Sequence, residues 1–413
     1  MKLYLSVSVA VTSLLLGLPM SAEASNFNYT KIADTNSLPF SNIYDAYLND
    51  AGTVSFISGT NNTGLGIYTG NGVSVTTIAD ASDTKSPFSR FETPVINNSG
   101  TVAFPAFLKS EAGGSGIFVA SSDAGVKTLY DTSSGSFSGF GSIPFGTLTG
   151  INNAGMVAFE AELNAGGSGI FTGFIGKPPT QIAAVPGTSP TGAKPFVAFP
   201  SINNSGTVSF LAVGLTGGPG LYTGNGGSFN TTANTSPTSP FNAFYGNAIN
   251  NLGTVAFSAG LKDTNSGIFT SSDGQLTKIV DSTGPFKQFN FPSLPNSTLS
   301  INDSGRVAFG AELTAGGTGI FTGSDPVADK VIGTGDILDG STVTNLILSS
   351  KALNNSDQVV FVATLTDANG TTHEGVYRAE PVPEPSSIAM FSMATLVMLG
   401  SSWLGRKQSD KVR

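Results

Sequence analysis

The stretch INNSGTVAF, residues 96–104, decides the fold, because variants of it recur along most of the chain. Asparagine tolerates left-handed backbone and glycine adopts it freely, so the segment from Asn97 to Gly100 predicts a tight turn. From Val102 to Ala106 every second residue faces the same way and is apolar, which predicts a strand with a buried face. The repeating unit is therefore a turn that leads into a strand.

Seven copies are present, and each is followed by a second motif of the Gly-Ile-Phe-Thr-Gly type. The copies begin at Leu48, Ile96, Ile151, Ile202, Ile249, Ile301 and, in a degenerate form, Leu353. A period of about 50 residues is typical of propeller blades rather than helical repeats. Two further strand-like segments per unit, one of the Lys-Ile-Val-Asp type and one of the Phe-x-x-Phe type, bring the strands per unit to the number in a blade. The sequence thus predicts an all-β, seven-bladed β-propeller over residues 25–379.

The last unit stops after Arg378, without its third and fourth strands. Residues 29–34 match the third-strand pattern, and Pro39-Phe40 opens a Phe-type segment. We therefore expect the N-terminal segment to complete the last blade and leave no open sheet edge. A β-solenoid or a pair of sandwiches is the alternative, although an open stack would need polar capping units that the repeats do not provide.

Composition narrows the possible partners. The net charge is -8 and the chain contains no cysteine. Nucleic acid is therefore not an expected partner, because phosphate binding needs a basic surface. Disulfides and thiolate metal sites are excluded, so stability must come from burial and from closure of the ring.

The N-terminal segment, residues 1–24, has the order of a secretory signal peptide. A basic Lys2 precedes an apolar run, and the small residues Ala22 and Ala24 precede Ser25. Signal peptidase is then expected to cleave between Ala24 and Ser25. An uncleaved N-terminal membrane anchor is the alternative.

The C-terminal end predicts a membrane span. Residues 386–405 carry no charge, and as a helix they would cross a hydrocarbon core of about 30 Å. Arg406 and Lys407 follow at once as a stop-transfer signal, which would keep the basic tail 406–413 in the cytoplasm and the body outside.

A Pro-rich linker, residues 380–385, precedes this span and contains Pro383, Glu384 and Pro385. The order of Pro-Glu-Pro, apolar helix and basic cluster resembles the PEP-CTERM sorting signal, a type of tail also named ice-binding protein C-terminal domain without implying ice binding. The resemblance implies processing by an exosortase, a membrane enzyme of bacteria that make extracellular polysaccharide. The polar extension after Lys407 is longer than is usual for such tails. An ordinary single-span anchor is the alternative.

The body itself resembles a family of bacterial surface proteins named for Asn-x-x-Gly-x-x-Ala-Phe repeats and a varied C-terminal anchor. This resemblance covers roughly residues 29–379 and brings no activity with it. A search for catalytic groups finds little. His373 is the only histidine, and we expect it in a solvated loop. Glu160 and Glu162 share a strand face, and Glu312 repeats the second of them. We expect solvated strand residues here, and a carboxylate pair of the glycosidase kind is the alternative.

The asparagine turns offer oxygen atoms that Ca²⁺ accepts, although they lack the dense acids of a dedicated calcium loop and turn formation alone explains them. Two functions from different classes therefore stay open. The first is a non-enzymatic, envelope-anchored or exosortase-processed protein that binds extracellular polysaccharide or matrix, with a purely structural role as a variant. The second is a polysaccharide hydrolase or lyase, which would require carboxylates such as Glu160, Glu162, Asp131, Glu312 or Asp281 to meet at one mouth of the channel.

Overall fold

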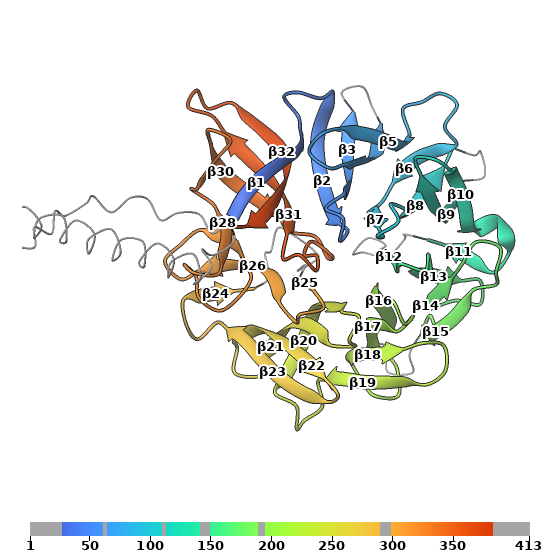
Figure 1. Ribbon diagram of the computed structural model, residues 1–413. Helices are drawn as coiled ribbons and strands as arrows, with labels where there is room; N and C mark the ends of the chain where they lie inside the picture. The colour runs from blue at the N-terminus through green and yellow to red at the C-terminus, as the bar shows by residue number, and fades with distance from the viewer. Residues whose placement is uncertain are drawn as a thin grey trace, which may run out of the picture.

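The structure, a computed structural model, describes residues 27–60, 64–109, 113–140, 149–188, 195–289 and 299–382. Seven antiparallel sheets stand around a central axis like the blades of a propeller (Figure 1). The prediction of an all-β, seven-bladed propeller is confirmed. The helical content of the described residues is the short 3-10 turn η1 (Thr132–Ser134).

Blades 1 to 6 follow one another along the chain, and each runs from an inner strand beside the axis to an outer strand. Blades 1 and 2 consist of β2 (Phe40–Leu48), β3 (Val54–Thr60), β4 (Leu65–Gly70) and β5 (Val75–Asp80), then β6 (Phe88–Phe91) with β7 (Val95–Ile96), β8 (Val102–Leu108), β9 (Ser115–Ser121) and β10 (Gly125–Asp131). Blades 3 and 4 consist of β11 (Phe137–Gly139) with β12 (Thr149–Ile151), β13 (Val157–Leu163), β14 (Ser168–Gly173) and β15 (Thr180–Val185), then β16 (Phe196–Ile202), β17 (Val208–Val213), β18 (Gly220–Gly224) and β19 (Phe229–Asn234). Blades 5 and 6 consist of β20 (Phe241–Ile249), β21 (Val255–Leu261), β22 (Ser266–Ser272) and β23 (Gln275–Asp281), then β24 (Phe286–Gln288) with β25 (Leu299–Ile301), β26 (Val307–Leu313), β27 (Thr318–Phe321) and β28 (Lys330–Gly333).

Blade 7 combines both ends of the described chain. It contains β29 (Ile337–Leu338), β30 (Ser341–Ile347), β31 (Val359–Thr366) and β32 (Thr372–Pro381). Its outer strand is β1 (Phe27–Asp34), which pairs antiparallel with β32 from Phe27 opposite Pro381 to Asp34 opposite Gly375. In Figure 1 the first strand lies beside the last.

The N-terminal segment contributes one strand to blade 7, where the sequence had suggested two. The segment that begins at Phe40 is β2, the inner strand of blade 1, and it pairs with β3. The same offset applies around the ring, because each Phe-type segment is the first strand of the next blade rather than the last of its own. A repeat pattern fixes the period, but it cannot fix where one sheet ends and the next begins.

The asparagine turn adopts the predicted left-handed backbone in every unit. Gly100 has φ 79°, and its N–H donates to the carbonyl of Asn97 at 3.0 Å. The side-chain oxygen of Asn97 also accepts from the N–H of Thr101 at 2.9 Å. In the degenerate seventh copy Asp357 stands in place of glycine and still has φ 58°. The turn therefore persists where its usual residue is lost.

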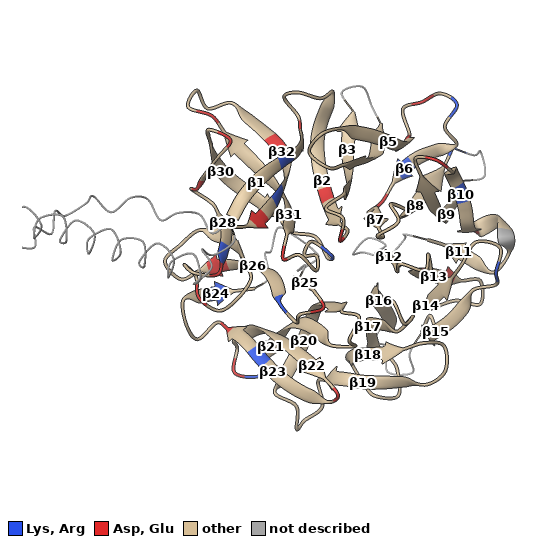
Figure 2. Ribbon diagram, in the orientation of Figure 1, with Lys and Arg blue, Asp and Glu red and all other residues tan. Residues whose placement is uncertain are grey.

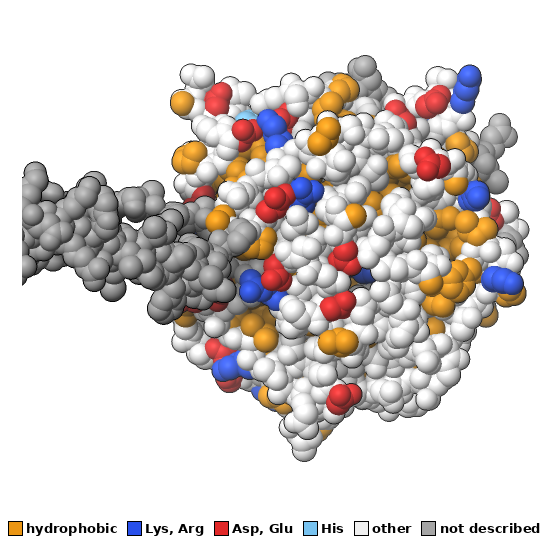
Figure 3. All heavy atoms as spheres, viewed as in Figure 1, with side chains coloured by type: hydrophobic (Ala, Val, Ile, Leu, Met, Phe, Trp, Pro, Cys, Tyr) orange, Lys and Arg blue, Asp and Glu red, His pale blue; other side chains and the backbone are white. Residues whose placement is uncertain are grey.

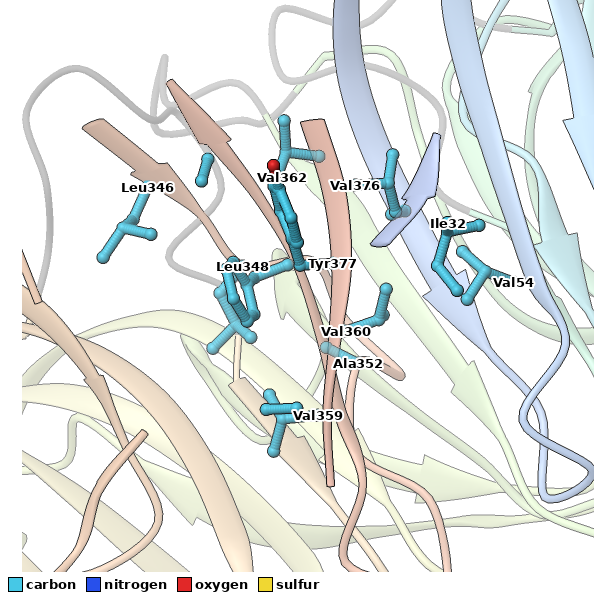
Figure 4. Close-up of a cluster of buried hydrophobic side chains, with 14 of the residues drawn as sticks. Ile32, Val54, Leu346, Leu348, Ala352, Val359, Val360, Val362, Val376 and Tyr377 are labelled. Carbon is cyan, nitrogen blue, oxygen red and sulfur yellow. The ribbon is translucent and has the colours of Figure 1, made fainter. Parts of the chain in front are cut away.

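The core is a layer of aromatic rings within each blade. Phe104 and Phe118 are direct cross-strand partners with ring centroids 5.9 Å apart, and Phe88 meets Phe118 edge-on at 4.8 Å. Such pairs add stabilisation of about 0.5–1.5 kcal/mol beyond the area they bury. Contacts between blades include aliphatic ones, as where Ile32 of β1 lies beside Val54 of β3 in the cluster of Figure 4. They also include aromatic ones, as where Tyr130 of blade 2 meets Phe159 of blade 3 at 5.3 Å.

The two ends of the chain fall outside the described residues. This applies to the predicted signal peptide with Ala22, Ala24 and Ser25, and to the Pro383-Glu384-Pro385 motif, the span 386–405 and the basic Arg406 and Lys407. Within the part of the chain that is described, no helix is long and apolar enough to span a membrane.

Candidate functional site: the asparagine-lined mouth of the channel

The first asparagine of each repeat ties its blade to the next. Asn97 is 4% exposed, and its Nδ2 donates to the backbone carbonyl of Asn152 in the following blade at 3.1 Å. The seven donors in order around the ring are Asn49, Asn97, Asn152, Asn203, Asn250, Asn302 and Asn354. The last of these, Asn354, donates to the carbonyl of Asn49 at 3.1 Å and so closes the circle.

A second circle lies outside the first and is exposed. The backbone N–H of Asn98 donates to Oδ1 of Asn153 at 3.0 Å, and the same bond recurs from blade to blade. Its members are Asp50, Asn98, Asn153, Asn204, Asn251, Asp303 and Asn355. Two carboxylates are among them, and Asn355 Nδ2 donates to both, to Asp50 at 3.1 Å and to Asp303 at 2.9 Å. Most polar atoms at this mouth are thus already paired with protein.

Inside the two circles is a small cavity of about 100 Å³, and Lys351 reaches into it. This residue comes from blade 7 with φ 59°, and its carbonyl accepts from the N–H of Leu48 at 3.1 Å. Its Nζ crosses to the opposite blades and donates to the carbonyls of Ile151 at 3.0 Å and Ile202 at 3.4 Å. Burial lowers the pKa of Lys351 to about 8, against the opposing effect of the Asp50 carboxylate. The ammonium group of Lys351 therefore fills the channel. It occupies the position in which a bound cation would otherwise contact these backbone carbonyls.

A separate polar cluster joins the inner strands of blades 7, 1 and 2. Ser349 Oγ donates to Asp45 Oδ1 at 3.0 Å and accepts from the N–H of Ala46 at 3.2 Å. Burial raises the pKa of Asp45 to about 6, and the nearby charge of Glu92 adds to the rise. Burial also raises the pKa of Glu92, although Arg90 pairs with it at 2.6 Å. Asp45 and Glu92 are thus two carboxyls on adjacent blades, both with a raised pKa.

The carboxylates singled out from the sequence do not gather at the mouth. Glu160 and Glu162 lie on β13 in the wall of blade 3, and neither lines the cavity. Glu312 pairs with Lys287 at 2.6 Å and Asp281 with Lys278 at 2.6 Å. Asp131 accepts from the N–H and hydroxyl of Ser133. The geometry that a channel-mouth hydrolase would require is therefore not assembled from these residues.

Glu160 has a different peculiarity. It is 3% exposed, not solvated as the sequence suggested, and its Oε1 has no hydrogen-bond partner within the described part of the chain. Burial raises its pKa to about 9, with a further contribution from Glu162. The corresponding residue of blade 4 is Leu211, which is buried among apolar neighbours. Glu160 is thus a neutral acid at a register where the other blades carry uncharged residues, which include Pro105, Ser258 and Gly310 as well as Leu211.

The remaining expectations concern histidine and metal. His373 is half-buried in β32 opposite Leu365, not in the hairpin loop that the sequence suggested, because the strand begins earlier than the polar residues indicated. Across the described ranges no three acidic or histidine side chains are placed to hold a metal ion. The turn asparagines use their Oδ1 atoms for the turn itself, as Asn97 does. A Ca²⁺ ion bound through these oxygens would have to displace those bonds.

Charge is scattered singly over the ring in the view of Figure 2, without a concentrated basic patch. Figure 3 shows acidic side chains near the centre of this face with Lys or Arg side chains close to several of them. Sequence reasoning missed Lys351 and Asp45. Both are charged residues at positions where the other repeats carry uncharged ones, so the sequence could have revealed them. The position of Asp45, for example, is Thr93 in the second repeat and Gly246 in the fifth.

The family to which this fold and site belong follows from comparison with known proteins. The model of a family described as "Family of unknown function (DUF7453)" matches residues 26–130 and 180–386, and the chain belongs to that family. No curated protein matches the chain.

Several solved structures share the general arrangement. One is prolyl oligopeptidase B from Galerina marginata, at 11% identity and a TM-score of 0.49, over 84% of this chain and 49% of that one. The chain thus spans about half the length of that enzyme. A second is the lectin of Aleuria aurantia bound to α-methyl-L-fucoside, at 11% identity and a TM-score of 0.39, over 71% of this chain and 92% of that one. These likenesses concern the course of the backbone and say nothing about activity.

The inner circle of asparagines predicts that alanine substitutions at two adjacent positions lower the free energy of unfolding by different amounts. Asn203→Ala removes a donor to the buried carbonyl of Asn250 and an acceptor for the N–H of Thr207. We expect it to lower the free energy of unfolding by about 2–4 kcal/mol, because buried polar groups lose their partners. Asn204→Ala is the matched control and should cost less than about 1 kcal/mol, since water can replace its exposed bond. Chemical denaturation of both variants measures this, and equal losses would contradict the assigned role.

Glu160 predicts a pH dependence of stability. The folded chain keeps this proton up to about pH 9, whereas an unfolded glutamate loses it near pH 4.3. The unfolded state therefore binds fewer protons between these values, and the stability of the wild type falls as pH rises through this window. Glu160→Gln removes the titration, so its free energy of unfolding relative to wild type should gain on the order of 4 kcal/mol between pH 5 and pH 8.

Denaturation curves at several pH values measure this gain. Glu312→Gln, which removes a half-buried, ion-paired carboxylate from blade 6, is the control, and it should not reproduce the gain of Glu160→Gln. Parallel pH profiles for wild type and Glu160→Gln would show that Glu160 is ionised in the folded chain.

Proposed function

We propose that this chain is an exported, surface-held binding protein whose propeller contacts extracellular polysaccharide or matrix without chemical turnover. The proposal rests on one observation, which is that the polar groups of the channel mouth are already hydrogen-bonded within the protein. Two closed circles of hydrogen bonds use most of its polar atoms for structure, and Lys351 blocks the cavity within them. A channel mouth whose polar atoms are already hydrogen-bonded, and whose cavity holds Lys351, favours a rigid binding protein over an enzyme with its active site in the channel.

Export and retention are assigned to the two ends. Residues 1–24 would be removed by signal peptidase after Ala24, and the span 386–405 would hold the body outside the membrane. The Pro383-Glu384-Pro385 motif would be the processing site of an exosortase, with Arg406 and Lys407 as the stop. The support for these assignments is the order of residues at each end.

Closure of the ring is assigned to β1. Its pairing with β32 covers the edge of blade 7, and Ile32 packs beside Val54 of blade 1. An uncovered outer edge would offer a row of free backbone groups to other chains. We infer that this strand keeps the body monomeric on a crowded cell surface.

The proposal predicts separate roles for the motif and the body. Changing Pro383, Glu384 and Pro385 to alanine should leave export intact and abolish the size shift between precursor and processed protein, because export depends on the other end. Cell fractionation and electrophoresis measure this. The processed protein should also be retained by extracellular polysaccharide from the producing cells in a pull-down.

Identical size and fractionation of wild type and motif variant would refute the sorting assignment and leave a plain membrane anchor. Absence of retention by polysaccharide and by matrix would refute the binding function. The two results are independent, since the motif lies outside the body.

A further inference from the structure

A groove of about 520 Å³ lies between blades 1 and 2, away from the channel mouth. Its floor is apolar and includes the buried rings of Phe88 and Phe118 and the half-buried Ile78. Its rim is polar, with Thr77, Asp80, Asp83, Lys85 and Thr128. Both its size and its apolar floor with a few polar groups are typical of sites for small ligands, which span about 300–1,000 Å³.

The contacts between neighbouring blades differ in how closely they pack. At the contacts of blades 7 with 1 and 3 with 4, an isoleucine of the outer strand packs on a glycine of the next blade. A Cβ added to Gly70 would lie 2.8 Å from Ile32 Cγ2, and one added to Gly224 would lie 3.2 Å from Ile182 Cγ2.

Blade 2 carries Ala120 at the register of these glycines, opposite Val102 as Gly70 is opposite Val54. The corresponding isoleucine of blade 1, Ile78, is half-buried, whereas Ile32 and Ile182 are each 5% exposed. The residue at this register does not decide the opening by itself, because blade 7 carries Ala379 there and Val331 of blade 6 is still 2% exposed.

The loop that borders the groove is held in place by blade 2. Lys109 Nζ donates to the carbonyls of Ala81 at 2.8 Å and Asp83 at 3.0 Å. Asp80 and Asp83 each use one carboxylate oxygen, Oδ1, to accept backbone N–H groups of the loop. Their Oδ2 atoms accept no hydrogen bond within the described ranges, which leaves two fixed acceptors at the rim.

We propose that this groove binds a pyranose unit of a neutral polysaccharide, an inference that rests on the proposed function. Ile78, Pro87 and Val126, which lie over the buried rings of Phe88 and Phe118, offer the apolar surface on which the C–H face of a sugar ring packs. The free oxygens of Asp80 and Asp83 accept hydrogen bonds from sugar hydroxyls. Asp80 and Asp83 are balanced by Lys85 and by Lys109, which holds the loop, so the rim has no excess of positive charge that would favour an anionic sugar.

The test uses the full chain in a detergent without a sugar headgroup. Binding of neutral trisaccharides built from glucose, mannose or galactose, and of oligogalacturonate, is measured by calorimetry and saturation-transfer NMR. The blocking variant is Val126→Arg, which places a long side chain across the rim from an exposed position on β10. Its matched control is Leu276→Arg on β23, because Leu276 is exposed and has the same register in blade 5.

We expect wild type and Leu276→Arg to bind at least one neutral trisaccharide with equal affinity, and Val126→Arg to bind it at least tenfold more weakly. Equal binding by Val126→Arg, or a preference for oligogalacturonate, would overturn the groove as a binding site for a neutral sugar and leave the proposed function standing. Retention by polysaccharide without binding of any neutral trisaccharide would do the same. Failure of both retention and trisaccharide binding would overturn the inference together with the proposed function.

Discussion

The hydrogen bond from the side chain of one asparagine to the backbone of the next blade is the interaction on which this structure depends. Each of these amides does two things at once. Its oxygen fixes the turn that starts a strand, and its nitrogen fixes the distance to the neighbouring blade. Because the amide is buried, loss of either bond leaves a polar group without water. Repeated in every unit, the bond makes the number and the spacing of the blades a property of the sequence motif itself.

How far the sequence predicts the structure follows from this double role. The turn was predictable from Asn97 and Gly100, because local backbone preference determines it. The hydrogen bond from Asn97 to blade 3 was not predictable, because the sequence does not show which backbone carbonyl lies next to the side-chain nitrogen. The blade boundaries were offset by one strand for a related reason, since a repeat has the same period wherever it is cut. Lys351 and Asp45 are single departures from the repeat, and their spatial partners lie in other blades.

These departures suggest where function resides in such a protein. The asparagines that recur in every repeat form the hydrogen bonds that close the ring, so they cannot change to bind a ligand without loss of those bonds. Lys351 fills the channel, and Glu160 introduces a neutral acid where blade 4 has Leu211. Between blades 1 and 2, where Ile78 is only half-buried, a groove opens. The groove is the departure that creates accessible space.

The measurement that tests the closed ring most directly exploits the absence of cysteine from the chain. Asn28 on β1 lies opposite Glu380 on β32. Cross-strand neighbours in an antiparallel pair are close enough for a disulfide, for which the Cα atoms must lie within about 7 Å. With cysteines at both positions, mild oxidation should produce an intramolecular disulfide in the monomer, whereas cysteines at Asn28 and Asn230, on the outer strand of blade 4, should produce none. Failure of the first pair to cross-link within one chain, or cross-linking only between chains, would contradict the closed propeller.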